Sequence, residues 1–103
     1  MSLIYHIARA SDWERATRDG EYTVSTAGRT LAEEGFIHAS QPHQVQGVRD
    51  AFFRDTPGLV LLVIDPDLVR APVRYDAVPG EPDPFPHIYG PLNTDAVVEV
   101  RAL

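Results

Sequence analysis

Three histidines in this sequence stand among large apolar neighbours, a setting in which an imidazole either binds a ligand or is held by the protein itself. His6 lies in Tyr-His-Ile, His38 in Phe-Ile-His-Ala-Ser and His87 in Phe-Pro-His-Ile-Tyr-Gly. A buried imidazole needs a hydrogen-bond partner, because an unpaired polar group away from water is costly. A neighbouring carbonyl or hydroxyl can satisfy each ring, and so can a ligand. The fourth, His43, follows Pro42 at a predicted helix start, where we expect a solvated or capping role.

The first two of these histidines lie on segments that alternate like strands. Residues 3–8 place His6 on one face of the first segment, and residues 36–40 place His38 and Ser40 on one face of the second. If the two strands are neighbours, both imidazoles and the hydroxyl project from the same side. The sequence therefore predicts the floor of a pocket.

Further polar and aromatic side chains are candidates for ligand binding. Arg74 follows the central strand and can grip an anion through its planar guanidinium, although an ion pair with one of the fifteen carboxylates would use it equally well. Tyr5, Tyr22 and Tyr89 would line a flat-ring pocket if they face inward. The other large aromatic residues, Trp13, Phe36, Phe52 and Phe53, are assigned to packing.

Several kinds of chemistry are disfavoured by the pattern. No His-x-His or His-x-x-x-His pair is present to anchor a catalytic zinc, so we predict no metal site. Ser40 is not in a Gly-x-Ser-x-Gly elbow, and two residues along a strand is a poor angle for a nucleophile and its base. Phosphate-cradling glycine motifs are missing, and the absence of cysteine excludes disulfides and thiol chemistry.

The helices that must position these residues are short. Ser11 and Glu14 have the spacing of a capping box, which predicts a helix ending near residues 19–20. A single turn is expected over residues 31–34, closed by a glycine. A third helix is expected over residues 43–55, where Val45, Val48 and Phe52 recur on one face.

The strands predicted around them include one that is fully buried. Residues 59–64 are apolar on both faces, which is typical of a central strand. The last segment alternates so that Val98 and Val100 face the core while Glu99 and Arg101 face outward. Residues 79–91 hold five prolines and two glycines, so we expect neither a helix nor an inner strand there. We interpret that stretch as a stiff loop that could close over a cleft.

Composition bounds the class of protein. A chain of 103 residues with 44% hydrophobic residues suits one domain over residues 1–103, and the pattern predicts an α+β fold of five or six short strands and two or three helices. The formal charge of −6, with arginine as the only cation among Lys and Arg, disfavours nucleic acid as a partner. No apolar run is long enough for a membrane helix, so the expected location is the cytoplasm.

Three segments together resemble a known bacterial family. They are Ile4–Ile7, Gly35–Ser40 and Phe85–Leu92, and the family is catalogued as domain of unknown function 952. The resemblance covers essentially the whole chain. Its members look like a minimal ADP-ribosyltransferase fold, a small split and twisted sheet around a nicotinamide-dinucleotide cleft. Their histidine motifs are most similar to those of RNA 2′-phosphotransferases.

The resemblance implies roles for individual residues. His6 matches the histidine that contacts the adenosine-side ribose, His38 matches the residue beside the nicotinamide, and Ser40 matches the serine of His-x-Ser. Many protein-modifying ADP-ribosyltransferases carry a glutamate at the third position of the motif. This sequence has no counterpart for it, because Glu99 is expected to face outward. That difference argues against protein ADP-ribosylation and leaves phosphate transfer or ligand binding.

Two main hypotheses of function follow. In the first, a small transferase binds a nucleotide or NAD in a cleft lined by His6, His38, Ser40, His87 and Tyr89, with Tyr5 and Arg74 as further ligand contacts. His38 would orient the leaving base, His6 would hold a ribose hydroxyl and His87 would be the acid or base. In the second, a non-catalytic binding or sensor domain uses the same cleft. A protein whose histidines are purely structural is the remaining alternative.

Overall fold

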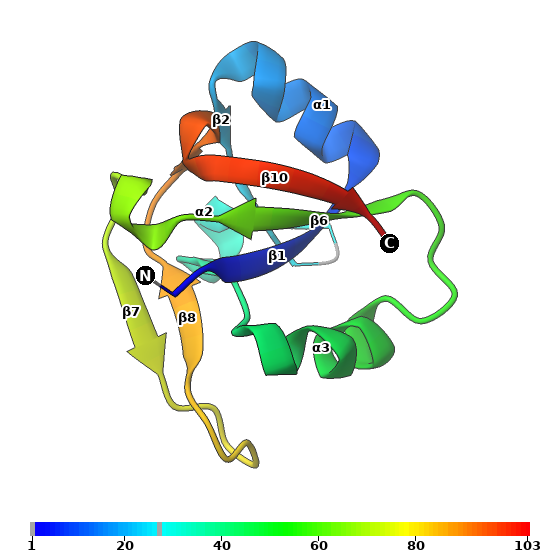
Figure 1. The fold of residues 1–103 in the computed structure, drawn as a ribbon, viewed down its shortest axis with the longest axis vertical. Helices are drawn as coiled ribbons and strands as arrows, with labels where there is room; N and C mark the ends of the chain where they lie inside the picture. Colours follow the sequence, from blue (N-terminus) through cyan, green and yellow to red (C-terminus); the bar gives the residue numbers. More distant parts are fainter. Residues whose placement is uncertain (1, 27) are drawn as a thin grey trace.

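Two three-stranded antiparallel sheets form the body of the protein. The computed structural model describes residues 2–26 and 28–103. The first sheet has the order β1 (Ile4–Arg9), β6 (Leu59–Ile64), β10 (Val97–Ala102), and the second has the order β5 (Ile37–His38), β8 (Phe85–Ile88), β7 (Val73–Asp76) (Figure 1). Two small pairs complete the strands: β2 (Glu21–Tyr22) with β9 (Leu92–Asn93), and β3 (Val24–Thr26) with β4 (Arg29–Thr30). The α+β class is confirmed, with more and shorter strands than predicted.

Strand β6 is the centre of the first sheet because it is apolar on both sides. Leu62 faces the larger core with Ile4, whereas Leu61 faces a second cluster with Ile7 and Phe53. The predicted alternation of β1 and the predicted burial of β6 are confirmed. Burial on both faces explains why β6 needs no polar residue.

In the described part of the chain, one isolated backbone bridge joins the two sheets, between β1 and the residues after β5. The Tyr5 amide donates to the Ser40 carbonyl at 2.9 Å, and the Ser40 amide donates to the Tyr5 carbonyl at 2.7 Å. The segments of His6 and His38 are therefore neighbours, which is the condition for the predicted pocket floor, although they belong to different sheets. This bridge holds the β5 segment against the edge of β1.

The helices are α1 (Ala10–Asp19), α2 (Leu31–Glu34) and α3 (Val45–Phe52), and the last follows a 3₁₀ turn, Pro42–Gln44. The capping box predicted at Ser11 is wrong, because α1 begins two residues earlier than a Ser11 N-cap implies, with Arg9 at its N-cap and no side-chain bond. A capping box forms instead at Thr30 and Glu33.

Helix α3 is shorter than predicted, and its last aromatic residue faces outward. Phe52 is 61% exposed, whereas Phe53 is 5% exposed and fills the second cluster. The assignment of Phe52 to packing is therefore wrong. The helix ends at Phe52, so the turn that follows brings Phe53 rather than Phe52 onto the inner face.

Strand β8 corrects the expectation that residues 79–91 contain no inner strand. It lies between β5 and β7 although it includes Pro86. The Pro86 carbonyl accepts from the Ala39 amide at 3.0 Å, and a residue's amide and carbonyl point to the same side of a strand. The missing N–H thus faces the side where β5 has already ended at His38, so β8 loses no bond to β7.

Strand β10 is the edge of its sheet, and here the predicted burial of the valines is wrong. Val98 is 53% exposed and Val100 is 42% exposed. The register shifts between Val97 and Glu99, which is the signature of a bulge. Both valines lie on an edge strand and stay exposed, so alternation alone did not place them in the core.

Gly90 is a position where a side chain would not fit. A Cβ there would lie 2.8 Å from the Ala71 Cβ, which is closer than real contacts. We expect Gly90→Ala to lower the free energy of unfolding by about 1–3 kcal/mol through overpacking. Gly47→Ala is the control, because a Cβ there meets nothing within 4 Å inside α3 and should be neutral or stabilising. Urea denaturation checks both, and equal effects would contradict the expectation.

Candidate functional site: a cleft beside His38

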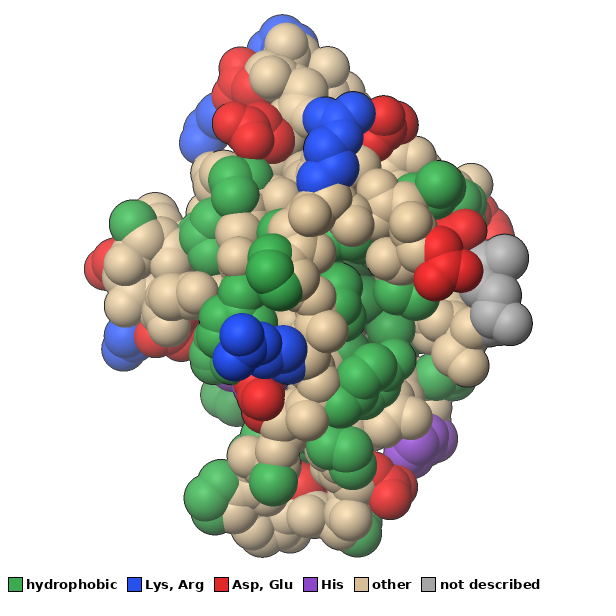
Figure 2. All heavy atoms as spheres, turned by 90° about the vertical axis from the view of Figure 1, so that its left-hand side faces the viewer, with side chains coloured by type: hydrophobic (Ala, Val, Ile, Leu, Met, Phe, Trp, Pro, Cys, Tyr) green, Lys and Arg blue, Asp and Glu red, His purple; other side chains and the backbone are tan. Residues whose placement is uncertain are grey.

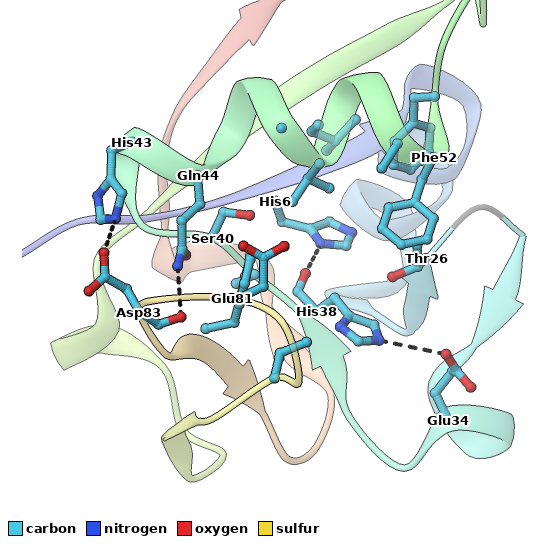
Figure 3. Close-up of a pocket in the computed structure, with 18 of the residues that line it drawn as sticks. His6, Thr26, Glu34, His38, Ser40, His43, Gln44, Phe52, Glu81 and Asp83 are labelled. Atoms are coloured by element: carbon cyan, nitrogen blue, oxygen red, sulfur yellow. Dashed lines mark hydrogen bonds and ion pairs between the residues drawn. The ribbon is translucent and has the colours of Figure 1, made fainter.

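A cleft of about 640 Å³ opens between α3, the loop from β7 to β8, and the segment of β3, β4 and α2. Figure 3 shows His6, Ser40 and His38 along its floor, with Phe52 at one end and His43 at the other. Its volume is in the range of small-molecule sites, about 300–1,000 Å³. The apolar part of the wall includes Val48, Ala51, Phe52, Phe53 and Phe85.

His6 is buried beneath the floor and both of its ring nitrogens are engaged. Nδ1 bonds the His38 carbonyl, and Nε2 lies 2.9 Å from the Tyr22 hydroxyl. A carbonyl can only accept, so Nδ1 carries the proton and Nε2 accepts from Tyr22. Burial lowers the pKa of His6 to about 4, which keeps the ring neutral. The ring thereby fixes the position of the His38 backbone.

His38 is the imidazole that opens onto the cleft. Its side chain is 40% exposed, and its Nε2 lies 3.6 Å from a Glu34 carboxylate oxygen. Partial burial and the neighbouring His87 lower its pKa, whereas Glu34 opposes the shift. A neutral ring at this place can accept a proton or hydrogen-bond a ligand.

His87 lies behind His38 rather than on a mobile loop. The two rings are edge to face with centroids 5.0 Å apart, and β8 pairs His87 with His38 on one side and with Arg74 on the other. His87 is 4% exposed, which corrects the loop position expected for it. Its Nδ1 donates to Asp76 at 2.8 Å, and its Nε2 is buried without a partner among the described residues.

Asp76 joins His87 to the aromatic surface next to the cleft. Its carboxylate also accepts from the Tyr89 hydroxyl, and these two bonds lower the pKa of Asp76. Tyr89 stacks on Phe36 with ring centroids 5.4 Å apart, and the Arg74 guanidinium lies 5.4 Å from the Tyr89 ring centroid. Phe36 thus packs as expected, but within an aromatic group on the sheet surface.

The predicted site residues fall into two groups. His6, Ser40 and His38 line the cleft, whereas His87, Tyr89 and Arg74 form the cluster beside it. Tyr5 belongs to neither group, because it packs against the second hydrophobic cluster. His38 connects the two groups through its contact with His87.

Two carboxylates of the site were not singled out from the sequence. Glu34 lies on the single turn predicted over residues 31–34, and Asp76 has no motif around it. Glu34 lines the cleft because α2 is one turn long and ends four residues before His38. Asp76 reaches His87 only through the pairing of β7 with β8. The four-residue spacing between Glu34 and His38 is the one local feature of the sequence that indicates their contact.

The far end of the cleft is held by bonds between the start of α3 and the loop before β8. His43 Nε2 lies 3.0 Å from Asp83, and the Gln41 side chain donates to the Pro84 carbonyl at 2.8 Å. The wall also carries Glu81 and Arg29, so acidic groups outnumber basic ones. In the described part of the chain, no group of three or more His, Asp or Glu side chains could hold a metal ion.

The fold and site define a small α+β protein with one histidine-floored cleft. Residues 7–100 match the family described as protein of unknown function (DUF952), and the chain belongs to that family. The crystal structure of protein CC0527 from Caulobacter crescentus is similar, with 30% identity and a TM-score of 0.84 over 96% of this chain and 83% of that one. Its solution NMR structure has a TM-score of 0.74 at 30% identity, covering 100% and 85% of the two chains. No curated protein matches the chain.

Proposed function

We propose that the cleft beside His38 binds a nucleotide-type ligand, with NAD as the candidate cofactor, and that the protein is a small transferase. The observation that carries this proposal is the position of His38, a half-exposed imidazole next to Glu34 in a cleft of ligand size. The arrangement of two small sheets joined beside the cleft supports a likeness to the ADP-ribosyltransferase fold. Fold likeness alone carries no function, so the argument depends on the cleft.

The residues of the cleft wall favour the base or nicotinamide ring of such a ligand over its phosphates. Val48, Phe52 and Phe85 offer apolar surface for a flat base. Glu34 and Glu81 favour a neutral or cationic ring over a run of phosphates, and the nicotinamide ring of NAD is cationic. Phosphates would instead lie toward Arg29 or toward Arg74 beyond His38.

In this proposal the histidines have different tasks. His38 contacts the ligand and, as a neutral ring beside Glu34, acts as the base or orients the leaving group. His6 is a positioning residue, because both its nitrogens are occupied and one of them holds His38. His87, oriented by Asp76, supports His38 from behind.

Nucleic acid remains disfavoured as a ligand. The face in Figure 2 shows single basic side chains scattered among acidic ones rather than a basic stripe. Among the described residues no helix is long and apolar enough to span a membrane. A small-molecule ligand fits these observations best.

A non-catalytic sensor that uses the same cleft is the second candidate. The observation in its favour is that His6 and His87 are both buried, so His38 is the one histidine on the floor that is substantially exposed. Turnover separates the two candidates. A transferase releases nicotinamide from NAD, and this release should fall in Glu34→Gln, whereas a sensor binds without product.

His38→Ala should abolish ligand binding without loss of the fold, because the side chain is half exposed. We expect NAD, ADP-ribose or a 2′-phosphorylated nucleotide to stabilise the wild type by about 2.7 kcal/mol at a hundredfold excess over the dissociation constant. Thermal shift and NMR titration measure this effect. His43→Ala, at the far rim, is the matched control and should retain binding. The proposal is contradicted if none of the three ligands shifts the wild type or if His38→Ala binds equally well.

A further inference from the structure

The sheet of β1, β6 and β10 has one open edge in the described part of the chain. Its β1 edge is closed by the bridge between Tyr5 and Ser40, whereas β10 pairs only with β6. Helix α1 packs on β1 and β2 and is drawn above β10 in the view of Figure 1. An unpaired edge presents free amides and carbonyls that can template pairing with another strand. The open edge contains no proline to block such pairing.

The backbone of β10 has its unpaired groups in a definite pattern. The Leu103 amide donates to the Leu59 carbonyl of β6 at 3.3 Å. Successive residues of a strand point their amides to opposite sides, so the amides of Arg101 and Glu99 also face β6. The amides and carbonyls of Val100 and Ala102 therefore face the open edge. They are available to a second strand without any loss of bonds to β6.

The side chains of β10 are complementary to a second copy of the same strand. Arg101 Nε lies 2.8 Å from Glu99, and both side chains are about half exposed. In an antiparallel pair with Val100 on the two-fold axis, Glu99 of one copy stands opposite Arg101 of the other. The four charges then alternate in sign, and opposite charges across a strand pair are stabilising. On the other face, the half-exposed Val100 side chains meet each other.

We propose that the protein forms a two-fold homodimer by antiparallel pairing of β10 with β10 of a second copy. The pairing joins the sheet of β1, β6 and β10 in one copy to the same sheet in the other copy, which gives one continuous sheet. The same surface of each copy meets itself, as a two-fold interface requires. The wild type should dimerise in a concentration-dependent manner, because a single strand pair buries a modest area.

Charge reversal at Glu99 and Arg101 tests this proposal directly. Glu99→Arg places only arginines at the interface, and Arg101→Glu places only glutamates, so each variant alone repels its own copy. We expect the dissociation constant of each to rise at least about tenfold, by sedimentation velocity. An equimolar mixture of the two variants restores opposite charges at every pair and should form a heterodimer. Circular dichroism checks that both variants are folded.

Three results would overturn the dimer. The first is a wild type that stays monomeric up to millimolar concentration. The second is self-association of both variants with the affinity of the wild type, which would place the interface elsewhere. The third is a mixture that remains monomeric although each variant is folded. Val100→Pro gives an independent check, because it removes an amide that faces the open edge and spares the bonds to β6.

Discussion

His6→Ala should lower the free energy of unfolding by about 3–5 kcal/mol, a large part of the ~5–15 kcal/mol of a typical domain. The ring is 4% exposed, so its removal leaves a cavity between the two sheets. It also frees the His38 carbonyl and leaves the buried Tyr22 hydroxyl without its acceptor. Tyr22 is 1% exposed, so water cannot easily replace the lost bond.

A double-mutant cycle with Tyr22→Phe isolates the buried bond. Alone, Tyr22→Phe should lower the free energy of unfolding by about 1–3 kcal/mol, because it leaves Nε2 of His6 unpaired. In the His6→Ala background the same change should have almost no effect. Urea denaturation measures all four proteins. A loss below about 1 kcal/mol for His6→Ala would show that the ring does not hold the two sheets together.

The protein should lose about 3 kcal/mol of stability as the pH falls from 6.5 to 4. Burial lowers the pKa of His6 from 6.5 to about 4 in the folded state, so in this interval the unfolded chain binds a proton that the folded chain does not. Each pH unit of the interval then favours unfolding by about 1.4 kcal/mol. Well above pH 6.5 the ring is neutral in both states, and its contribution is constant.

Urea denaturation at a series of pH values across this interval measures the slope. His38, whose pKa is also lowered, adds to it with the same sign. His6→Asn should therefore have a shallower slope than the wild type, whereas the control Gly47→Ala, which changes no titratable group, should keep the full slope. NMR of the His6 ring at pH 5–6 should show the neutral form protonated at Nδ1. Equal slopes in His6→Asn and the wild type would contradict the assignment.

Much of the fold could be predicted from local patterns. The alternation over residues 3–8, the apolar run over residues 59–64 and the turn over residues 31–34 all appear where the sequence placed them. These features depend on side-chain periodicity and on capping, which act within a few residues. The strand-like settings of His6 and His38 could also be predicted, whereas their neighbouring positions were only a condition of the pocket hypothesis.

Other features depended on which strands pair and were not predicted. Pro86 lies in an inner strand because its missing amide faces a side where β5 has ended. Val100 is exposed because β10 is an edge, and an edge cannot be distinguished from an inner strand by alternation alone. Phe52 faces outward because α3 ends there.

The features of the site also divide into those that local sequence determines and those that depend on the tertiary structure. The sequence determined that imidazoles stand on strand-like segments among apolar neighbours, since residue type and period are local properties. Only the tertiary structure decided their tasks, because burial and partners come from segments distant along the chain. Tyr22 occupies one nitrogen of His6, Asp76 occupies one nitrogen of His87, and His38 alone of the three opens onto the cleft beside Glu34. The Tyr22 contact joins strands of different sheets and the Asp76 contact joins neighbouring strands of one sheet, so no local pattern specifies either of them.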